Sequence, residues 1–198
     1  MGVAGAVPDF HAVVLAGGRS SRLGGEPKAR LRRAGRTLVE LTVEAVREAA
    51  AVVVVGPPDL PVPGGVLRTR EDPPFAGPAA GIAAGLRALD ALPEARWTMI
   101  LACDMPGVAG AVSPLLAAAR TGPDDAAGHV AVPPDGHRQP LAALYRSDVL
   151  RAAYAGQDPA GRSVFSFVRA LPLHDVAVAA EATADVDTWD DVHRFRLG

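Results

Sequence analysis

The sequence predicts a single α/β domain, residues 1–198, with a mostly parallel sheet and helices on both faces. Three observations predict it: short continuous apolar runs that stop at glycine or proline, helical apolar stripes between them, and 198 residues of which 49% are hydrophobic. Continuous apolar runs are typical of parallel strands that are buried on both faces. Strands that alternate with helices specify a sheet whose ligands bind beyond the carboxyl ends of the strands.

The first elements follow from apolar spacing and from the residues that interrupt it. Residues 1–10 lack periodicity and are expected to form a flexible lead-in. The apolar run 12–16 ends at a pair of glycines, which predicts a first buried strand. Thr37 is expected to cap a helix over 38–50, where apolar residues recur at roughly helical spacing. The run 51–55 predicts a second buried strand, because a glycine and two prolines follow it.

Proline-rich loops separate the elements in the middle of the chain. A brief strand is expected over 66–69, a helix over 81–92, and a buried strand over 97–102. A further helix is expected near 112–120. The strands therefore continue to alternate with helices, as a parallel sheet requires.

The C-terminal part adds a different connection. Strands 129–132 and 141–145 are separated by a Pro-Asp-Gly turn, which predicts a small antiparallel insertion. The remaining predicted elements are a helix that Ser147 caps and that runs to Tyr154, a helix over 164–169 that Ser163 caps, a short strand around Val186, and a helix from Trp189.

Charge and composition exclude several classes of function. The net charge is −2 and the arginines are dispersed, so no basic face for a nucleic acid is expected. The single cysteine, Cys103, rules out an internal disulfide. The N-terminus lacks a signal-peptide pattern, and no apolar stretch has membrane-spanning length, so we expect a cytoplasmic protein without a membrane partner.

The most informative segment is HAVVLAGGRSSRLGGEPKARL, residues 11–31. Lys28 is the one lysine beside nineteen arginines, and a compact ammonium suits a phosphate where a planar fork would not fit. Glycines let the backbone approach phosphate oxygens, and successive amides form an anion-binding nest to which Arg22 would add charge. The spacing matches neither a Walker A loop nor G-x-G-x-x-G. A plain tight turn is the alternative that the glycines alone would favour.

Carboxylates occur where ligands of a parallel sheet gather. Asp104 directly follows a buried strand in LACDMP, and Mg²⁺ takes one or two carboxylates together with substrate phosphates. Asp187 stands at the end of the short strand near Val186 and could reach the same metal. The alternatives are an aspartate that caps a turn and an acidic helix start. Cys103 is interpreted as a small buried residue rather than a nucleophile.

Five motifs occur together: LAGGRSSRLGG-x-x-K, GP-x-AGI, ACDMP, RQPLAALY and DVDTWDD. In order and approximate spacing they resemble the molybdenum cofactor guanylyltransferase family, the MobA-like NTP transferases, from His11 to about Arg194. The resemblance implies a Rossmann-like nucleotidyltransferase fold. It also implies Mg²⁺-dependent transfer of GMP from GTP to the terminal phosphate of molybdenum cofactor (molybdopterin), with release of pyrophosphate.

The resemblance also implies roles for individual residues. The catalytic residues would be Arg22, Lys28 and Asp104; the nucleotide would contact Leu15, Ala16, Gly17, Gly18, Lys28, Asp72, Gly77 and Asp104; and Asp104 and Asp187 would hold the metal. Two positions depart from the family: Pro27 replaces a usual aspartate, and Ala79 replaces a usual leucine. A relative that uses CTP or another phosphorylated acceptor, and a non-catalytic nucleotide-binding partner protein, remain alternatives. A protein that delivers the cofactor is a possible further partner.

Overall fold

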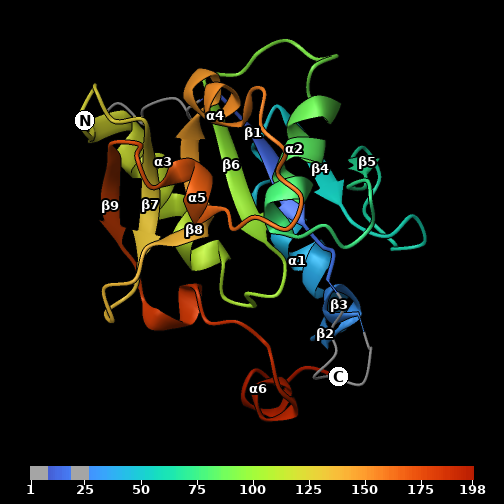
Figure 1. Cartoon of the computed structure of the whole chain (residues 1–198). Coiled ribbons are helices and arrows are strands. Elements are labelled where there is room, and N and C mark those ends of the chain that lie inside the picture. The colour runs from blue at the N-terminus through green and yellow to red at the C-terminus, as the bar shows by residue number, and fades with distance from the viewer. Residues whose placement is uncertain (1–8, 19–26) are drawn as a thin grey trace.

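Within the described part of the chain, residues 9–18 and 27–198 of a computed structural model, seven strands form one sheet (Figure 1). The strand order is β5-β4-β1-β6-β8-β7-β9. In sequence order these strands are β1 (Phe10–Leu15), β4 (Ala51–Val55), β5 (Leu67–Thr69), β6 (Trp97–Ala102), β7 (Gly128–Val132), β8 (Gln139–Arg146) and β9 (Leu173–Ala177). The α-helices are α1 (Leu38–Ala45), α2 (Pro78–Ala88), α3 (Ala109–Thr121), α4 (Ser147–Tyr154), α5 (Phe165–Val168) and α6 (Trp189–Arg194).

The sheet is parallel except around β8. Strand β1 pairs in parallel with β4 and β6, β4 with β5, and β7 with β9, whereas β8 is antiparallel to both β6 and β7. The predicted antiparallel pairing of β7 with β8 is therefore confirmed. Both strands belong to the main sheet, because β8 also pairs along β6. A separate antiparallel pair joins β2 (Arg32–Arg33) to β3 (Arg36–Thr37).

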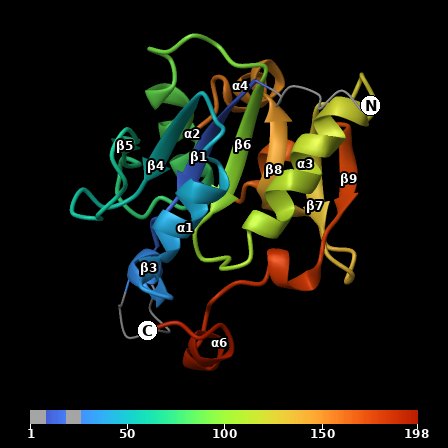
Figure 2. The ribbon, with the colours of Figure 1, turned by 180° about the vertical axis from the view of Figure 1, so that it is seen from behind.

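Helices cover both faces of the sheet, as the sequence predicts. Alternate residues of β1 point to opposite faces, so Val13 packs with Ile82 of α2 while Val14 packs in the cluster that contains Val39 of α1 and Leu115 of α3. Helices α4 and α5 lie on the α2 side (Figure 1), and α1 and α3 lie on the other side (Figure 2). None of the helices in the described ranges has the length and apolar character needed to cross a membrane.

The predicted boundaries are most accurate for two strands of mainly apolar residues. Strands 51–55 and 97–102 are found with the predicted limits. The helix predicted over 38–50 ends at Ala45, and the helix predicted from Gly81 begins at Pro78, because proline fits the first helical turn where no amide hydrogen is needed. Thr37 caps α1 as predicted, in a capping box with Glu40, and Thr188 forms a capping box with Asp191 at the start of α6.

Three predictions about the C-terminal half are wrong or incomplete. Val186 is not in a strand, because its N–H donates to the carbonyl of Asp104 at 2.9 Å instead of joining a ladder. Ser147 is the first residue of α4 rather than its cap, since its hydroxyl pairs with Thr98 at 2.9 Å. Strand β9 was not predicted. Ser163 does accept a hydrogen bond from the N–H of Ser166, at 3.3 Å, beside the shorter helix α5.

The loop after β6 touches the C-terminal segment closely at Gly107. A Cβ atom at this position would lie 2.0 Å from the carbonyl oxygen of Glu181, which is in the short 3₁₀ helix η3 (Ala180–Ala182). Two backbones therefore meet at a distance that only glycine permits. This contact holds the segment that leads to Asp187 against the loop that carries Asp104.

Gly107→Ala is expected to lower the free energy of unfolding by about 1–3 kcal/mol, because one backbone must shift to admit the methyl group. Denaturant unfolding monitored by circular dichroism measures the change. Gly110→Ala is the matched control: its Cβ would meet only the Ala182 methyl at 3.4 Å, and alanine favours α3 over glycine. Equal stabilities for the Gly107→Ala variant and the wild type would contradict the close contact.

Candidate functional site

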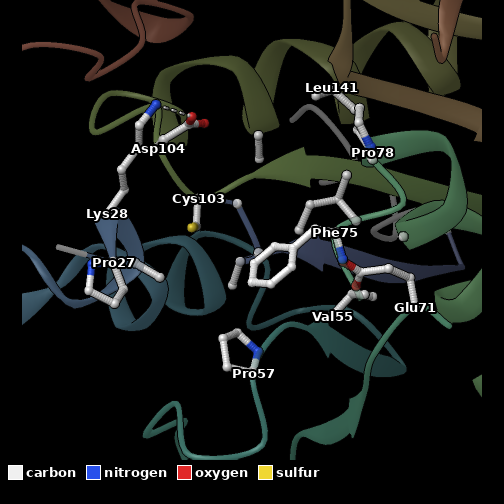
Figure 3. A pocket seen from close by; sticks show the side chains of 18 of the residues that line it. Pro27, Lys28, Val55, Pro57, Glu71, Phe75, Pro78, Cys103, Asp104 and Leu141 are labelled. Atoms are coloured by element: carbon white, nitrogen blue, oxygen red, sulfur yellow. Dashed lines mark hydrogen bonds and ion pairs between the residues drawn. The ribbon is translucent and has the colours of Figure 1, made fainter. Parts of the chain in front are cut away.

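A cavity of about 950 Å³ lies beyond the carboxyl ends of the central strands (Figure 3). Leu15 of β1 pairs with Val55 of β4 and with Ala102 of β6, so these three strands end at the same level. The chain then continues from β1 into Gly17 and Gly18, and from β6 into Cys103 and Asp104, all of which line the cavity. The topology thus brings together residues that are far apart in sequence, as predicted for a parallel sheet.

Lys28 lies between two carboxylates at one end of this cavity. Its ammonium nitrogen is 3.1 Å from Oδ2 of Asp104 and 2.5 Å from Oδ1 of Asp187, and it donates a hydrogen bond to each. The exposed fractions of the side chains are 19% for Lys28, 29% for Asp104 and 48% for Asp187. The predicted phosphate-binding cation and the two predicted metal ligands therefore form one cluster.

Packing of the C-terminus explains why Asp187 reaches Lys28. Val186 is buried in a small apolar cluster with Leu31, three residues after Lys28, and with Phe195, which follows α6. The backbones of Arg32 and Gly198 exchange two hydrogen bonds of 2.9 Å, which fix the end of the chain beside the segment that carries Lys28. The C-terminal segment is thus part of the site.

Charge interactions keep the Lys28 ammonium protonated. Partial burial alone would lower the pKa of Lys28, but the hydrogen bond to Asp187 and the negative charge of Asp104 outweigh this effect and raise it. At neutral pH the Lys28 ammonium places a full positive charge between the side chains of Asp104 and Asp187. An ammonium in this state can offset phosphate charge but cannot act as a base.

Asp185 lies near the same cluster, and its carboxyl group has a raised pKa. Desolvation of its carboxyl group, followed by the negative charges of Asp104 and Asp187, raises its pKa to about 6, although the residue as a whole is exposed. The adjacent thiol of Cys103 is buried, and burial, together with the charge of Asp104, raises its pKa. Cys103 is therefore a neutral thiol at physiological pH, which agrees with its interpretation as a small buried residue rather than a nucleophile.

Comparison with known proteins identifies the family. A family model described as "MobA-like NTP transferase domain" matches residues 12–176. The chain belongs to this family. It is 36% identical, over 89% of its own length and 88% of the relative's, to a probable molybdenum cofactor guanylyltransferase of Opitutus terrae. The chain is therefore a nucleotidyltransferase.

Solved structures share the fold of this MobA-like transferase. Rv0371c from Mycobacterium tuberculosis H37Rv is 22% identical, with a TM-score of 0.72 over 96% of this chain and 98% of the other. Molybdopterin-guanine dinucleotide biosynthesis protein A from Archaeoglobus fulgidus is 20% identical, with a TM-score of 0.67 over 93% of this chain and 96% of the other. The Rossmann-like nucleotidyltransferase fold expected from the motifs is confirmed.

The cavity of this MobA-like transferase is lined by most of the site residues that were predicted from the sequence. Arg22 lies outside the described residues. Asp72 is exposed and does not line the cavity. The assigned residues that do line it are Leu15, Ala16, Gly17, Gly18, Lys28, Gly77, Asp104 and Asp187.

Glu71, and not the predicted Asp72, is the acidic residue of this loop that lines the cavity. It lines the cavity, only 9% of it is exposed, and its Oε1 accepts a hydrogen bond from the N–H of Phe75 at 2.9 Å. Two prolines follow Asp72, and the loop has no periodic pattern that could tell which of two adjacent acids points inward. The residue Phe75, which also lines the cavity, was missed for the same reason.

Proposed function

We propose that this MobA-like transferase moves GMP from GTP to the terminal phosphate of molybdenum cofactor and releases pyrophosphate. The observation that carries the proposal is the convergence of Lys28, Asp104 and Asp187 at one end of a 950 Å³ cavity, beyond the strand that precedes the glycine-rich loop. A cavity of this size can enclose most of a nucleotide. The name of the relative from Opitutus terrae, a probable molybdenum cofactor guanylyltransferase, supports the choice of GTP and of the acceptor.

The nucleotide is proposed to lie along the end of β1. Backbone groups of Leu15, Ala16, Gly17 and Gly18 would hold the guanine nucleotide, and Glu71 and Gly77 would contact it from the opposite loop. Gly17 adds no side chain to this wall of the cavity, and the nearest atom that a Cβ there would meet is Glu71 Oε1 at 3.9 Å. Arg22 and Lys28 would neutralise the phosphates. These roles follow from the family motifs and from the lining of the cavity.

The residues present fit a Mg²⁺ ion. Asp104 and Asp187 offer carboxylate oxygens to a single ammonium, so both lie within reach of one cation. No group of three or more metal-binding side chains occurs in residues 9–18 and 27–198, so the other ligands would be phosphate and water oxygens. Two carboxylates plus substrate phosphates are the ligand set that Mg²⁺ commonly takes in nucleotide sites. When bound, Mg²⁺ would offset negative charge on the phosphates of the nucleotide.

The chain's own groups would position the substrates and neutralise the charge of their phosphates; they would not transfer protons. A phosphate oxygen of the acceptor attacks the α-phosphorus, the bond to the bridging oxygen breaks, and pyrophosphate leaves with the electron pair. The acceptor phosphate is already ionised near neutral pH, so the step needs no general base. Lys28 would stabilise charge on the transferring and leaving phosphates, while the loop after β1 would hold the nucleotide for in-line attack.

Pyrophosphate release tests the proposed reaction. The purified protein with Mg²⁺ is expected to release pyrophosphate from GTP when molybdopterin is present, with less release from CTP and none when EDTA removes the metal. Coupled pyrophosphatase detection and chromatography of the nucleotide products measure the reaction. Faster release from CTP would instead assign a cytidylyltransferase. Tight GTP binding without release in the presence of molybdopterin would favour a non-catalytic binding protein.

A further inference from the structure

Phe75 has an unusual backbone conformation at the wall of the cavity. Its φ angle is +64°, in the left-handed region that bulky residues rarely adopt. The residue is 47% exposed, and its ring projects into the cavity (Figure 3). Backbone strain of this kind persists when the surrounding structure enforces it, and it clusters at ligand sites.

The contacts around Phe75 enforce the conformation. The buried Glu71 carboxylate accepts a hydrogen bond from the Phe75 N–H at 2.9 Å. The carbonyl of the next residue, Ala76, accepts a hydrogen bond from Gly161 N–H at 2.8 Å, which ties the loop to the segment before α5. The guanidinium of Arg70 lies 5.2 Å from the centre of the Phe75 ring, within the range of a cation–π contact. The ring is therefore positioned before any ligand arrives.

The surroundings of the ring suit a flat apolar surface rather than a phosphate. Val55, the last residue of β4, and Pro57 line the same part of the cavity as Phe75, whereas Lys28 and Asp104 lie at another part of it (Figure 3). Asp187 lies with them, because it accepts a hydrogen bond from Lys28. A nucleotide has one charged end and one flat aromatic end. The cavity likewise holds the Lys28 cluster at one part and the Phe75 ring at another, where Val55 and Pro57 are apolar and the Glu71 carboxylate is tied to the Phe75 N–H.

From this geometry we infer that Phe75 is a stacking platform for the nucleobase, a further binding residue that rests on the proposed nucleotidyl transfer. Glu71 and Arg70 are positioning residues that hold the ring in place. Stacking on an aromatic ring favours bases with a larger π surface, so Phe75 should strengthen the preference for GTP over CTP. The glycine-rich loop and Lys28 would bind the phosphates of either nucleotide equally.

Isothermal titration of GTP and CTP, each with Mg²⁺, tests the inference in four variants. Phe75→Tyr keeps the ring, Phe75→Leu keeps apolar bulk without it, and Phe75→Gly removes the side chain and accepts the positive φ without strain. Phe165→Leu is the matched control, because Phe165 is 52% exposed on α5 and does not line the cavity.

The expected pattern separates stacking from other effects. Phe75→Leu and Phe75→Gly should weaken GTP binding about tenfold, while Phe75→Tyr and Phe165→Leu stay near the wild type. The ratio of GTP to CTP affinity should fall in Phe75→Leu. The Phe75→Gly variant should unfold at the same temperature as the wild type or higher, which would show that the loss of binding is not a loss of fold.

Two results would overturn the inference while the proposed function stands. One is wild-type affinity for GTP in both Phe75→Leu and Phe75→Gly. The other is an equal loss in Phe75→Tyr and Phe75→Gly, which would assign the effect to the loop backbone and not to the ring. Failure of the wild-type protein to bind any nucleoside triphosphate would instead refute the proposed function, and the stacking role with it.

Discussion

Lys28→Ala is expected to lower kcat/KM for nucleotidyl transfer by about 10²–10³, the usual loss when one preorganised charge contact to a reacting group is removed. The ammonium touches both Asp104 and Asp187 and stays protonated because their hydrogen bonds and charges raise its pKa against the effect of burial. Without it, the phosphates of the nucleotide would face two carboxylates with no opposing charge from this side chain. Steady-state pyrophosphate release at saturating and limiting GTP measures both kcat and KM.

Two companion variants sharpen this prediction. Arg30→Ala removes a cation two residues away, whose ion pair with Asp59 lies outside the cavity, and should keep wild-type activity. Lys28→Arg retains the charge but replaces a compact ammonium by a larger, planar guanidinium group, and should recover little of the lost activity. Near-normal turnover in Lys28→Ala would refute the catalytic role of Lys28. Full recovery in Lys28→Arg would show that only the charge matters.

The strands of the fold were predictable where burial alone determines them. Residues 51–55 form an unbroken apolar run and residues 97–102 a run interrupted only by Thr98, and the observed limits of both strands are those of the runs. Strand β9 escaped prediction because it lies at the edge of the sheet, where His174 and Asp175 interrupt the apolar pattern without disturbing the ladder. The strand predicted at Val186 does not form, although the residue is apolar, because its N–H donates to the carbonyl of Asp104 and not to a neighbouring strand.

The site residues that directly follow buried strands were predictable. Glycines and charged residues that directly follow buried strands have their position fixed by the strand, and Gly17, Gly18 and Asp104 line the cavity as expected. In the loop over 70–77, side-chain direction depends on a buried hydrogen bond from Phe75 to Glu71 and on a positive φ angle. Neither feature leaves a periodic signal in sequence, so the assignment of Asp72 missed the inward-facing acid by one residue.

Asp104→Asn is expected to reduce turnover by about 10²–10³ and to raise the Mg²⁺ concentration needed for half-maximal rate. Asparagine keeps the shape of the side chain but removes one of the two charges that Lys28 now bridges. The matched control is Asp175→Asn on β9, where the carboxylate pairs with Arg138 at the surface and does not line the cavity. Mg²⁺ titrations of pyrophosphate release in the two variants give the comparison.

A second readout of Asp104→Asn does not depend on activity or on metal. Desolvation, followed by the negative charges of Asp104 and Asp187, raises the pKa of Asp185 to about 6. Removing the Asp104 charge should therefore lower the Asp185 pKa, so that this carboxyl group ionises at lower pH in metal-free protein. Carboxyl chemical shifts followed by NMR from pH 3 to 8 measure the change. An unchanged Asp185 titration, together with an unchanged Mg²⁺ requirement, would mean that the carboxylate at position 104 does not share the cluster on which the proposed chemistry depends.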